Sequence, residues 1–173
     1  MKWPLVLFLA AATACGMYDF LTMQVPNRLT VPLILAGLVY RAWAGDWWGG
    51  FLGALVWFVV GAVMAATGGM GGGDVKFMAA IGAWAGVYGG LMVFAVASLI
   101  GAAWATVKLA RLGMLKQKLL YLLYWCGSIF TGVRQPLLVK MPGEGVPREA
   151  IPFAACLAAG VWVMTAAAWY VRY

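Results

Sequence analysis

Two aspartates stand where an apolar chain rarely keeps a charge, each with turn-forming residues nearby. Asp74 follows three glycines, at positions 71–73, between two long apolar runs, and Asp19 closes the first apolar run of the chain. A carboxylate at a membrane boundary costs a few kcal/mol on insertion scales, so it is usually retained for a task. Two carboxylates that share one proton and one water form a general base and a general acid. Such a pair hydrolyses a peptide bond without a metal or a covalent nucleophile.

The composition places these carboxylates in a membrane protein. The 173 residues are 65% hydrophobic and 10% charged, with a mean hydropathy of +0.93, which excludes a soluble domain. The net charge of +7 would suggest a nucleic-acid partner in a soluble protein, but here the basic residues cluster between apolar runs and indicate membrane orientation instead. Three scattered cysteines and the absence of histidine argue against a zinc site or a disulfide framework.

Apolar runs predict an all-α, polytopic fold with about six membrane spans in a single domain, residues 1–173. The expected spans are residues 3–18, 30–44, 50–67, 75–87, a fifth that follows Tyr88 and two glycines and ends near residue 107, and 152–171. The apolar stretch 119–133 is short for a span and predicts an interfacial or re-entrant helix, with a seventh span as the alternative.

The basic residues predict the orientation of these spans. If the turn after the first span faces the cytoplasm, nine basic residues lie inside and three outside, as the positive-inside rule favours. The nine are Arg28, Lys76, Lys108, Arg111, Lys116, Lys118, Arg134, Lys140 and Arg148, and the three are Lys2, Arg41 and Arg172. Both Asp19 and Asp74 then lie at the cytoplasmic face. Asp46, among tryptophans at the opposite interface, is interpreted as an exposed acid without a role in catalysis.

The glycines before Asp74 predict the geometry of the site. An extended substrate approaches the main chain closely only where side chains are missing, so Gly71, Gly72 and Gly73 are expected to leave that space open. Asp74 is expected to open a helix, whose dipole, together with Lys76, favours the charged carboxylate. The simpler alternative is a glycine-rich turn that joins two helices, with Asp74 as a helix cap.

Two stretches resemble the active-site motifs of type IV prepilin peptidases, membrane aspartic peptidases of the Gly-x-Gly-Asp type. One is GGGDVKF at residues 71–77, and the other is Asp19 with VPN at residues 25–27; order and spacing agree over most of residues 15–90. A Pro-aromatic pair at residues 152–153 is similar to the last helix of the short members that serve tight-adherence pili. The resemblance implies that Asp19 and Asp74 form the catalytic dyad and that Gly71 and Gly73 are the motif glycines. It also implies that Pro26 and Asn27 form the turn that positions the second helix, and that Lys76 is a motif lysine.

The resemblance also implies the reaction and its partners. We expect removal of the basic leader of prepilins or pseudopilins at the cytoplasmic face of the bacterial inner membrane, with no metal and no other cofactor. Membrane lipid is the other expected partner, near the basic loop, and no nucleic acid is expected. Longer family members add a cytoplasmic domain that methylates the new N-terminus. The loop expected after the first span, about residues 19–29, is far too short for a domain, so we expect cleavage without methylation.

The sequence also allows other interpretations of the two acids and of the N-terminus. Paired carboxylates in a membrane also serve proton or cation transport, although such transporters usually show two related halves and no internal repeat is evident here. A scaffold subunit without chemistry would leave the two acids unexplained. The N-terminal run before Cys15 imitates a lipoprotein signal peptide, but cleavage there would place Asp19 on the wrong side of the membrane.

Overall fold

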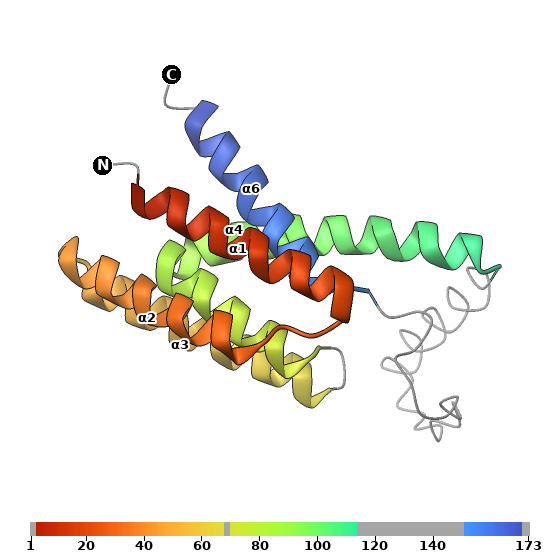
Figure 1. Cartoon of the computed structure of the whole chain (residues 1–173), viewed down its shortest axis with the longest axis horizontal. Helices are drawn as coiled ribbons and strands as arrows, with labels where there is room; N and C mark the ends of the chain where they lie inside the picture. Colours follow the sequence, from red (N-terminus) through yellow and green to blue (C-terminus); the bar gives the residue numbers. More distant parts are fainter. Residues whose placement is uncertain (1–2, 68–69, 114–150, 171–173) are drawn as a thin grey trace, which may run out of the picture. The chain divides into compact units, whose positions relative to one another are not determined.

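The structure, a computed structural model, describes residues 3–67, 70–113 and 151–170, and these residues form helices and short connections without a strand. The helices in chain order are α1 (Trp3–Thr22), α2 (Asn27–Trp43), α3 (Trp47–Ala66), α4 (Gly72–Arg111) and α6 (Phe153–Tyr170) (Figure 1). The all-α class predicted from the sequence is confirmed. The stretch 119–133, for which the sequence predicts an interfacial helix, lies outside the described residues.

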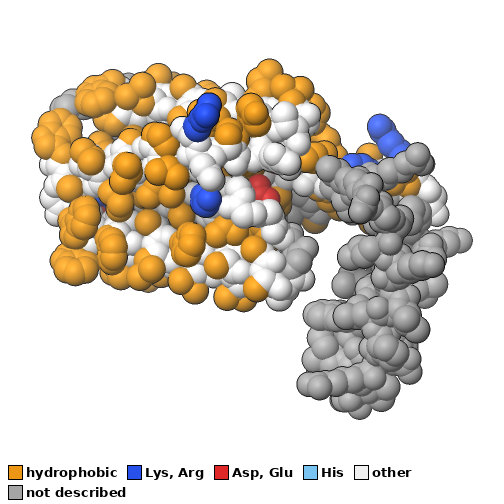
Figure 2. Space-filling view, turned by 60° about the horizontal axis from the view of Figure 1, so that its bottom comes forward, with side chains coloured by type: hydrophobic (Ala, Val, Ile, Leu, Met, Phe, Trp, Pro, Cys, Tyr) orange, Lys and Arg blue, Asp and Glu red, His pale blue; other side chains and the backbone are white. Residues whose placement is uncertain are grey.

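The outer surface of these helices is apolar. In the described part of the chain, four helices are long and apolar enough to cross a membrane, namely α1, α3, α4 and α6, and α2 has 17 residues. Large side chains such as Leu21, Val39 and Leu99 are about 70% exposed. Figure 2 shows a face on which hydrophobic side chains predominate and charged ones are sparse. A surface of this kind requires lipid around it, so the chain is an integral membrane protein.

The chain divides into two compact units, which are described separately. The first comprises Met1–Gly101 and Pro152–Tyr173, and therefore holds α1, α2, α3, most of α4 and α6. The second is Ala102–Ile151, and its described part is mainly the last ten residues of α4. Every contact discussed below lies within the first unit.

Small residues let the helices of the first unit approach closely. A Cβ on Gly53 of α3 would overlap the carbonyl oxygen of Gly82 in α4, so the two backbones touch there. Between α1 and α6, a Cβ on Gly16 would stand 2.6 Å from the Cβ of Ala158. Lipid gives no hydrophobic drive for helices to associate, so such close backbone packing stabilises the bundle.

Helix α4 breaks at Gly86, where φ is +74° and ψ is −174°, a conformation that essentially only glycine adopts. Gly82 before the break and Gly90 after it both lie against the indole of Trp57. Helix α4 reverses its direction at the break (Figure 1). The Trp57 Nε1–H donates to the carbonyl oxygen of Val87 at 3.0 Å. The sequence predicts this turn after Val87, whereas the backbone turns slightly earlier.

The ends of the first two helices also differ from the predicted spans. Helix α1 continues to Thr22, four residues beyond the predicted end, and α2 begins at Asn27, three residues before the predicted start. Hydropathy ends a span at the first polar residue, but helical hydrogen bonds continue past it. Asp19 therefore lies inside α1, in its last turn, where its carbonyl oxygen accepts from the N–H of Met23 at 2.7 Å.

Candidate functional site

Asp19 is a buried carboxylate that faces the start of α6. Its side chain is only 4% exposed, although it lies one turn before the end of a membrane helix. The backbone N–H of Ala155 donates to its Oδ2 at 3.3 Å. Ala155 is in the first turn of α6, where backbone N–H groups have no partner within the helix and can bind an anion. The start of α6 therefore supplies the polar environment for this carboxylate.

Asp74 is in the first turn of α4, as the sequence predicts, and it also caps that helix. Its Oδ2 accepts from the backbone N–H of Gly71 at 3.2 Å. Gly71 precedes the first helical residue, Gly72, so Asp74 reaches back from the third position of the helix, as in a capping box. The capping interpretation is thus correct as a description of this hydrogen bond.

The two carboxylates converge on α6. The backbone N–H of Ala154, next to Ala155, faces both Asp19 and Asp74, and the two carboxylates are close enough to interact electrostatically. The thiol of Cys156 is also within electrostatic range of both. One end of α1, α4 and α6 therefore carries two acids around shared backbone donors. This arrangement allows one carboxylate to act as a base while the other holds a proton.

The backbone donors of α6 are the part of the site that sequence reasoning missed. Ala154 and Ala155 carry no functional side chain, so residue type gives no indication of their role. The Pro-aromatic pair Pro152-Phe153 is the one signal in the sequence, since it marks where α6 begins. The site brings together no group of three or more His, Cys, Asp and Glu side chains able to hold a metal ion, as far as the described residues extend.

Gly73 has a different role from the one expected. A Cβ at this position would stand 2.8 Å from the carbonyl oxygen of Val25 and 3.0 Å from its nitrogen. The backbone of Val25, in the connection between α1 and α2, fills the space that the missing side chain leaves. The expectation that Gly73 leaves room for a substrate is therefore wrong, because packing against Val25 uses that room. Among the described residues, a Cβ on Gly72 would meet nothing within 4 Å, and a Cβ on Gly71 would meet Asp74, its hydrogen-bond partner.

The turn Pro26-Asn27 begins α2, and its second residue binds Lys76. Pro26 has an extended backbone, with φ −71° and ψ 139°, and is the residue before the helix. The Nζ of Lys76 donates to Oδ1 of Asn27 at 2.7 Å. Lys76 forms no ion pair with Asp74, since residues two apart on a helix point in different directions. The expected interaction between Lys76 and the carboxylate is therefore replaced by a contact with α2.

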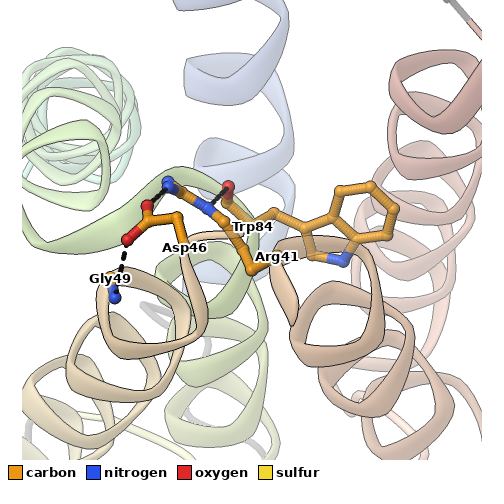
Figure 3. A network of polar contacts seen from close by, with 4 residues as sticks. All are labelled: Arg41, Asp46, Gly49 and Trp84. Carbon is orange, nitrogen blue, oxygen red and sulfur yellow. Dashed lines mark hydrogen bonds and ion pairs between the residues drawn. The ribbon is translucent and has the colours of Figure 1, made fainter. Parts of the chain in front are cut away.

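Asp46 belongs to a separate polar cluster at the far end of α2 (Figure 3). It forms an ion pair with Arg41, and its Oδ1 accepts from the N–H of Gly49 at 3.1 Å, which caps α3. The Nε of Arg41 donates to the carbonyl oxygen of Trp84 at 3.1 Å, near the break in α4. Residues 27 and 41 are about 21 Å apart along α2, at 1.5 Å per residue. Asp46 is therefore not a third member of the carboxylate pair.

Comparison with known proteins identifies a family for this chain. Residues 6–106, more than half of the chain, match the type IV leader peptidase family. A prepilin leader peptidase/N-methyltransferase of Bacillus subtilis is 31% identical over 163 residues, 91% of this chain and 53% of that protein. The protein of the same name in Escherichia coli is 33% identical over 136 residues, 60% of each chain.

A third relative of that name, from Aeromonas hydrophila, is 38% identical over 111 residues, 59% of this chain and 36% of that protein. The chain thus spans little more than half the length of the B. subtilis and E. coli relatives. No solved structure matches it. The family match includes both aspartates and the glycines before Asp74. The chain belongs to the type IV leader peptidase family.

Proposed function

We propose that this protein is a prepilin leader peptidase, an aspartic endopeptidase that removes the basic leader of type IV prepilins or pseudopilins. The observation that carries the proposal is the convergence of Asp19 and Asp74, from two different helices, on the N–H of Ala154. A structural cap for α4 requires only Asp74. Asp19 likewise accepts from the first turn of α6, but the two separate helix contacts do not require the carboxylates to meet, whereas an acid–base pair does.

In the proposed reaction a water molecule lies between the two side chains. The ionised carboxylate takes a proton from this water as its oxygen attacks the carbonyl carbon of the scissile peptide bond. The protonated carboxyl donates a hydrogen bond to the carbonyl oxygen. When the tetrahedral intermediate collapses, the C–N bond breaks and the leaving nitrogen receives a proton from the pair. One water is consumed, two peptides are released, and no cofactor takes part.

The position of the pair suits a substrate that is itself in the membrane. Both carboxylates lie at helix ends, Asp19 in the last turn of α1 and Asp74 in the first turn of α4. The excess of basic residues on this side supports a cytoplasmic location in the inner membrane. There the pair would meet the peptide bond just before the apolar helix of a prepilin. The basic leader would remain in water.

We also propose that this chain cleaves without methylating the product. The connections within α1–α4 are Met23–Pro26, Ala44–Asp46 and Thr67–Gly71, each of five residues or fewer. A small domain needs about 50 residues, so none of these connections holds a methyltransferase. Mature pilin produced by this chain alone should carry a free N-terminal amine, which mass spectrometry would show. An N-methylated product that depends on this chain and S-adenosylmethionine would contradict the proposal.

The decisive test is cleavage of a purified prepilin in detergent by the wild type and by Asp19→Asn and Asp74→Asn. Each substitution removes one half of the acid–base pair, so we expect kcat to fall by roughly a thousandfold or more, since general acid–base groups contribute about 10²–10⁴-fold each. A chelator should leave the wild-type rate unchanged. Activity near the wild-type level in either variant, at equal amounts of folded protein, would refute the assignment.

A further inference from the structure

Lys76 is the charged residue nearest to Asp74 in the sequence, yet its contact is with α2. Its Nζ donates to Oδ1 of Asn27 at 2.7 Å, which joins positions 49 residues apart in the chain. Asn27 is the first residue of α2 and follows directly on the connection that leaves α1 after Asp19. A hydrogen bond from a charged donor is among the stronger ones in a protein. Lys76 thus links the start of α4 to the start of α2.

A second contact joins the same two segments. The backbone of Gly73 packs on the backbone of Val25, where a Cβ would stand 2.8 Å from the Val25 carbonyl oxygen. Gly73 and Lys76 are three residues apart and so lie on one face of α4. Val25 lies in the connection before α2, two residues ahead of Asn27, the first residue of that helix. The Gly73–Val25 and Lys76–Asn27 contacts together fix α4 against the segment that follows Asp19, and we call this pair of contacts the latch.

The segment between Asp19 and the latch needs such an anchor. Met23, the first residue after α1, has φ +55°, a left-handed conformation that costs free energy for a residue other than glycine and persists only where its surroundings maintain it. Only Met23–Pro26 separate α1 from α2. A displacement of α2 relative to α4 would therefore act directly on the end of α1 and on the distance between the two carboxylates.

We propose that Lys76 is a positioning residue, which, through Asn27, holds Asp74 in register with Asp19. The proposal rests on the peptidase function proposed above, because it assigns Lys76 a part in that reaction. Lys76 does not touch the reacting atoms in this scheme. The alternative is that its ammonium group binds the substrate directly. Replacing Asn27 should have the same effect as replacing Lys76 if Lys76 is a positioning residue, but not if Lys76 binds the substrate.

A double-mutant cycle tests the latch. We expect Lys76→Met and Asn27→Leu each to lower kcat for prepilin cleavage by up to about tenfold, as the loss of an exposed hydrogen bond with a charged donor implies. KM should stay within about twofold of the wild-type value. The double variant should be no slower than either single variant, because both substitutions remove the same contact. The thermal unfolding midpoints of the four proteins should show the same non-additivity.

Conservative variants and a neighbouring cation provide the controls. Lys76→Arg keeps a charged donor and Asn27→Asp keeps an acceptor, so both should retain kcat within about threefold. Asn27→Asp also places an acid in the first turn of α2, which the helix dipole favours. Arg28→Gln removes one positive charge beside Asn27, from a side chain with no hydrogen bond or ion pair to a described residue, and it should leave kcat and KM unchanged.

Two results would overturn the proposal. One is additive losses in kcat and in thermal stability, which would show that residues 27 and 76 act independently. The other is a raised KM in Lys76→Met that Asn27→Leu does not reproduce, which would assign Lys76 to substrate binding. If the wild type cleaves no prepilin at all, the proposed function fails. The double-mutant cycle measured by thermal unfolding then decides by itself whether the latch exists.

Discussion

Replacing one glycine before Asp74 should lower the proposed peptidase activity, whereas replacing its neighbour should not. A Cβ on Gly73 would stand 2.8 Å from the carbonyl oxygen of Val25, but a Cβ on Gly72 would meet no described residue within 4 Å outside its own turn. Both residues lie in the first turn of α4 and have no side chain. The variants Gly73→Ala and Gly72→Ala therefore add the same methyl group to the same turn, and they differ only in what that group meets.

The structure sets the size of the effect. Ordinary contact begins near 3.4 Å, so the added methyl of Gly73→Ala moves Val25 and α4 apart by about 0.6 Å, and neither is a flexible side chain. A misplacement of 1 Å costs about a hundredfold in rate, so 0.6 Å should lower kcat roughly tenfold. Overpacking costs about 1–3 kcal/mol and alanine gains up to about 1 kcal/mol over glycine in a helix. The net loss of stability should therefore be no more than about 3 kcal/mol.

The assay is prepilin cleavage by the two variants and the wild type, with thermal unfolding measured in the same detergent. Gly72→Ala should retain the wild-type kcat and unfold at the same temperature or slightly higher. Gly73→Ala should be folded but slow. Equal activity of the two alanine variants would show that the contact between Gly73 and Val25 does not position the pair, and the reasoning would fail.

Two further predictions concern the far end of the bundle. Gly86→Ala should destabilise the protein by roughly 1–3 kcal/mol, because φ +74° with ψ −174° is essentially restricted to glycine; an unchanged unfolding temperature would contradict the break in α4. Asp46→Asn should cleave prepilin at the wild-type rate and lose less than about 1 kcal/mol of stability, because its ion pair with Arg41 is half exposed and asparagine also caps a helix. A marked loss of cleavage in Asp46→Asn would instead connect this cluster to the site.

The sequence was enough to predict those residues of the candidate site whose side chains are unusual in an apolar chain. Asp19 and Asp74 stand out because a charge is costly beside apolar runs, and the glycines at 71–73 mark the start of a helix. The role of Gly73 was expected incorrectly, and the contact of Lys76 with Asn27 was not foreseen, since the sequence places both residues beside Asp74 but does not show what they face. Val25 and Asn27 come to these positions only when α1 and α2 fold against α4.

Sequence alone determined the class of the protein, because a chain with 65% hydrophobic residues can bury its helices only in lipid. It also determined which residues are acids and in what order the helices occur. Tertiary structure decided the rest: the burial of Asp19, the backbone donors of Ala154 and Ala155, and the reversal at Gly86. The physical reason is that backbone N–H groups are alike at every residue. Only the packing of α6 against α1 selects the ones that face the two carboxylates.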